Sequence, residues 1–352
     1  MKVLITGAAG FIGANLALKL LVKEANVDIL GIDSLNNYYD TSLKYYRLEE
    51  INKIAATRTA STWSFVQGNI ADKELINRLF IEFQPDIVVN LAAQAGVRYS
   101  ITNPDAYIES NLIGFYNILE ACRHSYDNGR DGVQHLVYAS SSSVYGSNTK
   151  VPYSTDDKVD NPVSLYAATK KSNELMAHAY SKLYNIPSTG LRFFTVYGPA
   201  GRPDMAYFGF TDKLLRGEKI KIFNYGNCKR DFTYIDDIVE GVIRVMNKAP
   251  QRKTGEDGLP IPPYVVYNIG NHNPENLLDF VKTLQEELIA AKVLPADYDF
   301  EAHKELVPMQ PGDVPVTYAD TSALERDFGF KPSTPLREGL RHFAQWYKTF
   351  HK

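Results

Sequence analysis

Short apolar runs alternate with segments of helical periodicity through the first half of the chain. The apolar runs predict strands at Lys2–Thr6, Asp28–Asp33, Trp63–Gln67, Ile87–Leu91, His135–Ser140 and Ser188–Phe194. Strands that alternate with helices are typical of a parallel sheet covered by helices. The pattern therefore predicts an α/β fold built on a parallel sheet.

Two longer segments, Asn111–His124 and Leu165–Tyr184, carry apolar residues at helical spacing and are predicted as helices. Such helices could also pack against a second copy of the chain in a dimer. After Gly198 the rhythm of strands weakens, and Ala249–Pro263 resembles a linker. Further helices are predicted at Gly209–Arg216, Leu277–Ala291 and Leu336–Thr349.

This change in the pattern of strands and helices predicts two regions of unequal size. Residues 1–197 are expected to form the larger domain. Residues 198–352 are expected to form mainly a smaller, interleaved substrate-binding region, with some segments returning to the larger core. A chain of 352 residues is long enough to bury an enclosed site between its elements.

The composition of the chain limits the kinds of partner that we expect it to bind. The 38 Lys and Arg residues nearly balance the 41 Asp and Glu residues, and no basic run suggests a nucleic-acid surface. Cys122 and Cys228 lie far apart and lack the spacing of metal ligands, so neither a disulfide framework nor a metal site is expected. The apolar N-terminal stretch breaks at Gly7 and is too short to cross a bilayer. We therefore expect a cytoplasmic protein without nucleic-acid, membrane or metal partners.

A glycine motif follows the first predicted strand. Gly7, Gly10 and Gly13 form G-x-x-G-x-x-G at the start of a predicted helix. Glycine allows a tight turn and a close backbone approach, and a helix N-terminus presents free N–H groups to a pyrophosphate. This context predicts a Rossmann-type, doubly wound parallel sheet that binds a dinucleotide.

Asp33 ends the second predicted strand, where a carboxylate can accept hydrogen bonds from an adenosine ribose. Because it would repel a 2′-phosphate, NAD is favoured over NADP; the alternative is a turn aspartate after a buried strand. Further cofactor contacts are expected at Phe11, Ile12, Asn37, Asn69, Ile70, Ala92 and Ala93. For Asn69 and Ile70, a plain polar loop is an equally good interpretation.

Tyr166 and Lys170 lie four residues apart in a predicted helix, which places both side chains on one face. The ammonium favours the phenolate form of the tyrosine, as a general base requires. A tyrosine and lysine at this spacing are common by chance, so the weight comes from a serine run, Ser140 to Ser143, at the carboxyl end of a predicted strand. Open α/β sheets bind their ligands at this edge, and the serine hydroxyls can orient a substrate oxygen.

Several ordered segments carry a resemblance that covers nearly the whole chain. They are Ala139–Gly146, Arg192–Pro199, Gly201–Ala206, Arg230–Asp237 and Gln310–Val314, beside the glycine motif and the Tyr/Lys pair. Together they resemble the extended short-chain dehydrogenase/reductase family, and within it the nucleotide-sugar epimerases, closest to the UDP-glucuronate 4-epimerases.

The resemblance implies a tightly held NAD, a UDP-sugar substrate and a homodimer formed through the two long helices. It implies that Tyr166, with Ser141 or Ser143, acts at the sugar O4, and that Lys170 contacts both Tyr166 and the nicotinamide ribose. It also implies that Arg230 contacts a phosphate and that Asp313 contacts the uridine ribose. The neutral hydroxyls of Ser141 to Ser143 and Thr195 could hold the sugar carboxylate. Arg202 either balances the sugar carboxylate or is a surface-loop arginine.

The implied reaction is a reversible inversion at C4 of UDP-glucuronate through a 4-keto sugar, with Tyr166 as base and NAD as transient hydride acceptor. Dehydratases and decarboxylases of this family carry an acidic residue beside the serine motif, whereas Ser141, Ser142 and Ser143 supply only hydroxyls. Alternatives are 4-epimerisation of UDP-glucose or a UDP-N-acetylhexosamine, decarboxylation of UDP-glucuronate, and a non-catalytic dinucleotide sensor.

Overall fold

The computed structural model describes residues 1–310 and 313–351, and the chain divides into two compact units. The first unit comprises Met1–Asn148, Lys158–Phe193 and Val239–Tyr267. The second comprises Thr149–Asp157, Phe194–Ile238 and the chain from Asn268 onward. Each unit is thus assembled from separate stretches of sequence.

A seven-stranded sheet forms the centre of the first unit, in the order β12-β6-β5-β4-β1-β2-β3. Its strands are β1 Lys2–Thr6, β2 Asp28–Asp33, β3 Thr62–Gln67, β4 Ile87–Asn90, β5 His135–Ser141, β6 Ser188–Phe193 and β12 Tyr264–Ile269. The neighbours from β3 across to β6 pair in parallel. The predicted α/β fold of Rossmann type is confirmed.

The strand order explains where a ligand can lie. The chain leaves β1 toward β2 and β3 on one side, and returns to β4 and β5 on the other. Crossover connections at such a switch point run in opposite directions and leave a crevice at the carboxyl ends of the strands. Gly7, Asp33, Leu91 and Ser142 directly follow or end these strands, so all lie along one edge.

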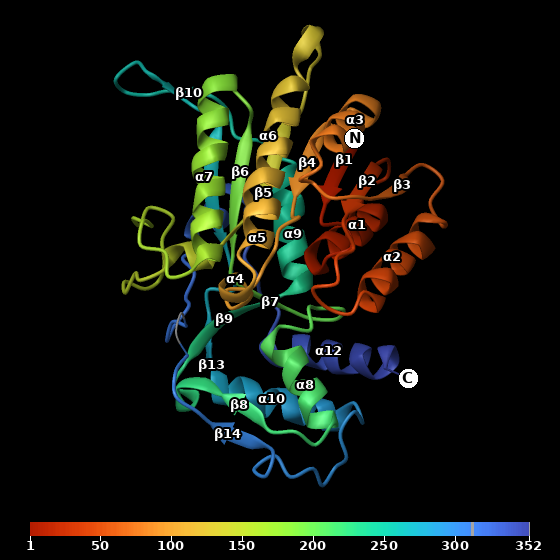
Figure 1. Cartoon of the computed structure of the whole chain (residues 1–352), viewed down its shortest axis with the longest axis vertical. Coiled ribbons are helices and arrows are strands. Elements are labelled where there is room, and N and C mark those ends of the chain that lie inside the picture. The colour runs from red at the N-terminus through yellow and green to blue at the C-terminus, as the bar shows by residue number, and fades with distance from the viewer. Residues whose placement is uncertain (311–312, 352) are drawn as a thin grey trace. The chain divides into compact units, whose positions relative to one another are not determined.

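Helices cover the sheet on both faces. Successive residues of a strand point to opposite faces, and Val3, Leu4 and Ile5 of β1 are all fully buried. The helices of the first unit include α1 Phe11–Lys23, α2 Ser42–Ala55, α3 Lys73–Phe83, α6 Phe115–His124, α7 Leu165–Tyr184 and most of α9 Ile235–Met246. Figure 1 shows α6 and α7 running side by side along the sheet.

Helix α7 has the bounds that the sequence predicted. The Ser164 side chain caps its first turn by accepting from the Ala167 N–H, and Asn185 ends it in the left-handed region at φ 57°. The other predicted helix, Asn111–His124, is interrupted. The π-helical segment η1, Ile108–Gly114, precedes α6 and contains Asn111. Such π segments are frequent at functional sites.

The stretch Ala249–Pro263 is not a linker, which corrects the prediction. It forms a two-stranded antiparallel ribbon of β10 Lys253–Thr254 and β11 Pro260–Ile261. The Gly255 N–H donates to the Leu259 carbonyl at 2.8 Å, and Gly258 adopts φ 77° in the turn. Loop-like composition concealed a hairpin because glycine and proline also mark tight turns.

The second unit holds a three-stranded sheet, in the order β13-β9-β7, and a separate pair of strands. Its strands are β7 Thr195–Tyr197, β8 Ile220–Ile222, β9 Lys229–Tyr234, β13 Pro274–Asn276 and β14 Lys304–Leu306. Its helices are α8 Ala206–Leu215, α10 Leu277–Ala290, α11 Ser322–Phe328 and α12 Leu336–Phe350. Aromatic rings fill its core; Phe232, for example, stacks on Phe280 with 4.2 Å between ring centroids.

Candidate active site

The glycine loop between β1 and α1 forms a cradle, a tight turn in which two positions have no room for a side chain. Gly7 adopts φ +70°, and a Cβ there would lie 2.8 Å from the Ala92 nitrogen. A Cβ on Gly13 would lie 2.2 Å from the Gly7 carbonyl oxygen, far inside van der Waals contact. Side chains at these two positions are therefore excluded from the loop, and a ligand can approach its backbone directly.

Helix α1 begins at the end of this loop without a side-chain cap at Gly10. The uncapped first turn, which includes Phe11, Ile12 and Gly13, offers N–H groups and a positive dipole end to an anion. The same loop stands at the switch point of the sheet. The residues present therefore fit the pyrophosphate of a dinucleotide.

Asp33 lies at the end of β2, beside the glycine loop. Its carboxylate accepts from the Ala9 N–H at 3.2 Å and the Leu35 N–H at 2.9 Å, which fixes its orientation. The buried Lys44 places Nζ 3.8 Å from Asp33 Oδ1. Burial lowers the pKa of Lys44, and the charge of Asp33 acts in the opposite direction.

Two cationic side chains in the region of Asp33 were not identified from the sequence. Besides Lys44, the buried Arg47 donates to the Ala9 carbonyl at 2.9 Å and to the Tyr39 hydroxyl at 2.7 Å. Both lie on one face of α2 at the i, i+3 spacing, which was the available signal. They brace the segment that follows β2 against the glycine loop.

The remaining expected cofactor residues divide by their surroundings. The Ala92 N–H donates to Thr6 Oγ1 at 3.1 Å, which holds the loop after β4 against β1. Ile70 is buried, while Asn69 donates to Glu109 at 2.8 Å and caps the Ala71 N–H. Asn37 is exposed in a bend after β2, and Ala93 lies in the loop after β4.

Lys170 joins the Tyr/Lys helix to the sheet. It is almost fully buried, and its Nζ donates to the Ala139 carbonyl near the end of β5 at 2.9 Å. Burial lowers the pKa of Lys170 to about 8. On the same helix, the Tyr166 ring meets the Tyr107 ring edge to face, with 6.0 Å between centroids.

Asn111 is a further residue that sequence interpretation missed. Its Nδ2 donates to Thr169 Oγ1 at 3.0 Å, and Thr169 Oγ1 donates to the Tyr166 carbonyl at 2.8 Å. Asn173 in turn donates to the Asn111 carbonyl at 2.6 Å. These bonds fasten the π-helical segment to the first turns of α7 and so steady Tyr166.

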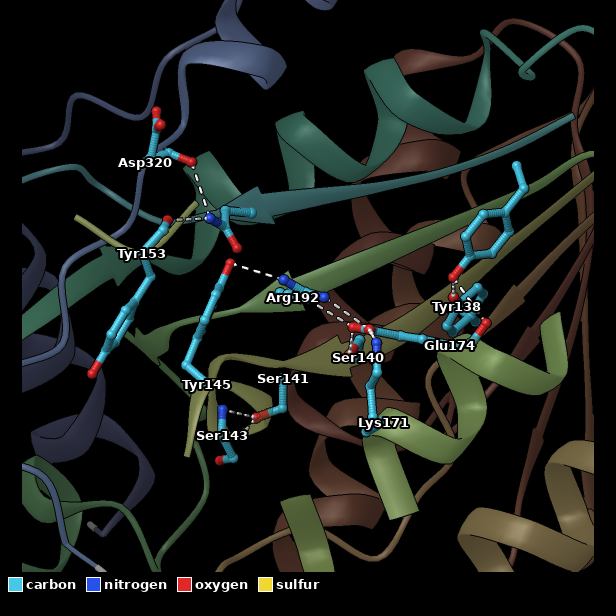
Figure 2. Close-up of polar contacts among 12 residues, drawn as sticks. Tyr138, Ser140, Ser141, Ser143, Tyr145, Tyr153, Lys171, Glu174, Arg192 and Asp320 are labelled. Carbon is cyan, nitrogen blue, oxygen red and sulfur yellow. Dashed lines mark hydrogen bonds and ion pairs between the residues drawn. The ribbon is translucent and has the colours of Figure 1, made fainter. Parts of the chain in front are cut away.

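The serine run points in two directions (Figure 2). The Ser141 hydroxyl donates to the Ser143 hydroxyl at 3.1 Å and accepts from the Ser143 N–H at 3.1 Å, which closes a short turn at the strand end. The Ser140 hydroxyl instead donates to Glu174 Oε1 at 2.7 Å. Ser142 begins the 3-10 segment η3, Ser142–Tyr145, that carries the run away from β5.

In the second unit, Thr195 is the first residue of β7, and Arg230 lies on β9. The Arg230 guanidinium donates to the Lys229 carbonyl at 3.0 Å and the Pro315 carbonyl at 3.2 Å. The Asp313 N–H donates to the Gln310 carbonyl at 3.2 Å. The structure thus brings Arg230 to the segment that follows Asp313.

Arg202 has a carboxylate partner that sequence interpretation did not consider. Its guanidinium forms a fork with Asp204, with bonds of 3.0 Å and 2.7 Å. The two side chains are about a quarter exposed. An Arg–carboxylate fork is geometrically specific, so a ligand carboxylate at Arg202 has to share it with Asp204 or displace Asp204.

Comparison with known proteins identifies the family of the chain. The family model described as "NAD dependent epimerase/dehydratase family" matches residues 3–270. The protein CapI of Staphylococcus aureus is 50% identical over 358 residues and aligns along the whole of both chains. UDP-glucuronate 4-epimerase 4 of Arabidopsis thaliana is 45% identical, with 100% of this chain and 76% of that protein covered.

The fold is also similar to a solved structure. The UDP-glucuronic acid 4-epimerase of Bacillus cereus, in complex with UDP-glucuronic acid and NAD, superimposes with a TM-score of 0.82 at 30% identity. The match covers 99% of this chain and 100% of that one. With its glycine cradle, its Tyr/Lys helix and a family model that matches most of its length, the chain belongs to the NAD dependent epimerase/dehydratase family.

Proposed function

We infer that the protein is a UDP-glucuronate 4-epimerase that interconverts UDP-glucuronate and UDP-galacturonate. The observation that carries this inference is the bond from Lys170 to Ala139, which fastens the Tyr/Lys helix to the strand end where the serine loop begins. Similarity along nearly the whole of this chain to named UDP-glucuronate 4-epimerases supports the choice of substrate.

NAD would be held by the cradle of Gly7, Gly10 and Gly13 and by Asp33, and when bound it supplies a reversible two-electron acceptor at the sugar carbon. Tyr166 takes the proton from the sugar O4 and later returns it. Ser141 and Ser143 orient that oxygen by hydrogen bonding, and the Lys170 ammonium stabilises the tyrosine phenolate. Phe11, Ile12, Asn37, Asn69, Ile70, Ala92 and Ala93 line the proposed cofactor site.

Epimerisation is favoured over decarboxylation because the serine loop carries no acid of its own. Glu174 touches Ser140 but is bound by the Arg192 fork at 2.8 Å through both oxygens, so it cannot act as a free acid or base. Assays with UDP-glucuronate and UDP-glucose, combined with a measurement of carbon dioxide release, separate the alternatives. Faster turnover of UDP-glucose, or stoichiometric carbon dioxide, would overturn the assignment.

We further propose that residues 1–197 mainly bind NAD and that residues 198–352 mainly bind the UDP-sugar. Arg230 suits a diphosphate because its guanidinium can pair with two oxygens at once. Asp313 accepts from the uridine ribose hydroxyls. Ser142 and Thr195 supply neutral hydrogen bonds to the sugar, which is free to turn while the nucleotide stays anchored.

Arg202→Ala should discriminate between sugars. If Arg202 balances the sugar carboxylate, its loss lowers kcat/KM for UDP-glucuronate about 10- to 100-fold and leaves UDP-glucose binding nearly unchanged. Arg216→Ala is a matched control, since Arg216 also pairs with a carboxylate two residues on, Glu218, at 2.6 Å. Steady-state kinetics and calorimetry measure both quantities. Equal losses for the two sugars would remove the carboxylate role.

Activity should fall as the pH rises through about 8. Burial lowers the pKa of Lys170 to about 8, so the side chain is an ammonium below that pH and neutral above it. The neutral amine no longer supports the Tyr166 phenolate, and kcat declines. We expect this falling limb in profiles between about pH 6 and pH 10, and its absence in the slower Lys170→Met variant. A wild-type kcat that rises steadily to pH 10 would contradict the role of Lys170.

We propose that the protein is a cytoplasmic homodimer whose interface includes α6 and α7. Exposed apolar side chains lie along these helices and η1: Leu175 and Leu183 are 60% and 72% exposed, and Ile113 is 47% exposed. Leu175→Glu should halve the mass measured by sedimentation, whereas Ile81→Glu on α3, also exposed, should leave it unchanged. A wild-type monomer would contradict the dimer.

In the described part of the chain, no helix has the length and apolar character needed to span a membrane.

A further inference from the structure

A buried ion pair lies behind the serine loop of the first unit. Arg192 on β6 donates from Nε and Nη2 to the two oxygens of Glu174 on α7, each at 2.8 Å. Both side chains are only 3% exposed. Burial acts to raise the pKa of Glu174, but the bonds and charge of Arg192, the bond from Ser140 and the charge of Lys171 together outweigh it, and the pKa lies below its usual value. Glu174 is therefore a buried carboxylate, not a neutral acid.

A buried ion pair is weak evidence for stability, because desolvation of both charges offsets much of their attraction. What distinguishes this pair is the set of groups that it holds. The Ser140 hydroxyl donates to Glu174 Oε1 at 2.7 Å, and Arg192 Nη1 donates to the Tyr145 hydroxyl at 3.1 Å. Figure 2 shows both contacts converging on the pair.

Ser140 and Tyr145 flank the turn that contains Ser141 and Ser143. One anchor precedes this turn on β5, and the other ends η3. Both ends of the serine loop are thus tied to one ion pair. The Arg192 guanidinium also lies 4.9 Å from the centre of the Tyr145 ring, which adds a cation–π contact to the second anchor.

The Glu174 side of the ion pair connects it to the helix that carries the proton acceptor. Glu174 is on α7, one turn beyond Lys170 and two turns beyond Tyr166. Lys171 on this helix lies 3.2 Å from the second oxygen of Glu174 and holds it further. A helix is rigid over two turns, so a fixed Glu174 side chain fixes the position of Tyr166 relative to the serine loop.

We propose that Glu174 and Arg192 are positioning residues that clamp the serine loop to α7, and so set the separation of the Ser141 hydroxyl from the Tyr166 phenol. This inference rests on the proposed roles of Ser141 and Tyr166. Misplacement of a catalytic group by about 1 Å can cost about 100-fold in rate. The clamp therefore acts on kcat more than on substrate binding.

Substitution of Glu174 or Arg192 themselves would leave a buried charge unpaired and risks unfolding. The test therefore removes single anchors and keeps the pair. Ser140→Ala and Tyr145→Phe should each lower kcat about 10-fold, while KM for UDP-glucuronate and the content of bound NAD change less than about 2-fold. Ser188→Ala is the control, because Ser188 is buried on β6 and, among the contacts described, its hydroxyl bonds only to the nearby Ile186 carbonyl.

The decisive comparison adds Ser141→Ala. If Ser140 acts through Ser141, then Ser140→Ala costs no further activity in the Ser141→Ala background, whereas a general structural role gives two losses that multiply. Multiplying losses, a rise in KM at unchanged kcat, or an equal loss in Ser188→Ala would each overturn the clamp. A wild-type enzyme that leaves UDP-glucuronate unchanged would contradict the proposed function instead, and the two failures are thus distinct.

Discussion

Tyr166→Phe is expected to lose about 10²- to 10⁴-fold in kcat while it still binds NAD and UDP. Phenylalanine keeps the ring and its edge-to-face contact with Tyr107, so the helix and the site retain their geometry. Only the group that takes the O4 proton is lost. Turnover is measured with UDP-glucuronate, NAD by release from denatured protein, and UDP binding by calorimetry.

Tyr180→Phe is the matched control, because Tyr180 lies on the same helix and its hydroxyl donates to Glu120 at 2.7 Å. It should retain kcat within about 2-fold, with some loss of stability from the lost hydrogen bond. Wild-type turnover by Tyr166→Phe would show that another group takes the proton. An equal loss in both variants would point to a general effect of tyrosine hydroxyls on helix α7.

Gly13→Ala should abolish NAD binding. Its Cβ would lie 2.2 Å from the Gly7 carbonyl oxygen and 3.1 Å from the Ala8 Cα, and these backbone atoms cannot yield as a flexible side chain would. The loop must open, which displaces the N–H groups that we propose bind the pyrophosphate. We expect purified protein without bound NAD and a melting temperature several degrees lower, measured by cofactor release and calorimetry.

Gly209→Ala provides the comparison. Gly209 lies in helix α8 at an ordinary φ, and the nearest atom to an added Cβ is the Pro203 carbonyl oxygen at 3.4 Å. Alanine there should be neutral or slightly stabilising, since it restricts the unfolded chain without a clash. Full NAD content in Gly13→Ala would mean that the loop does not cradle the cofactor.

Local sequence signals were enough to predict the strands, loops and helix that carry the candidate site. The glycine spacing, the carboxylate at the end of β2 and the helical spacing of apolar residues in α7 are each read from a short stretch of sequence. Parallel strands place their carboxyl ends along one edge, so the serine run and the glycine loop could be assigned to the same crevice. Helix α7 accordingly runs over Leu165–Tyr184, as predicted.

The contacts that support these elements depend on the tertiary fold. Arg192 lies in an apolar strand and Glu174 in a helix, and nothing in the spacing of either residue indicates that they meet at 2.8 Å. The π-helical segment at Asn111 is hydrogen-bonded to α7, and helical periodicity does not encode this contact. The Asp204 partner of Arg202 is different: a carboxylate two residues away was visible in the sequence.

The most direct test of the proposed function is incubation of the purified protein with UDP-glucuronate, without added NAD, followed by NMR of the sugar. We predict conversion to UDP-galacturonate, with C4 inverted and the C6 carboxylate retained, because in the proposed mechanism the protein retains its own NAD and returns the cofactor to its starting state. Unchanged UDP-glucuronate, or a pentose product that has lost C6, would contradict it.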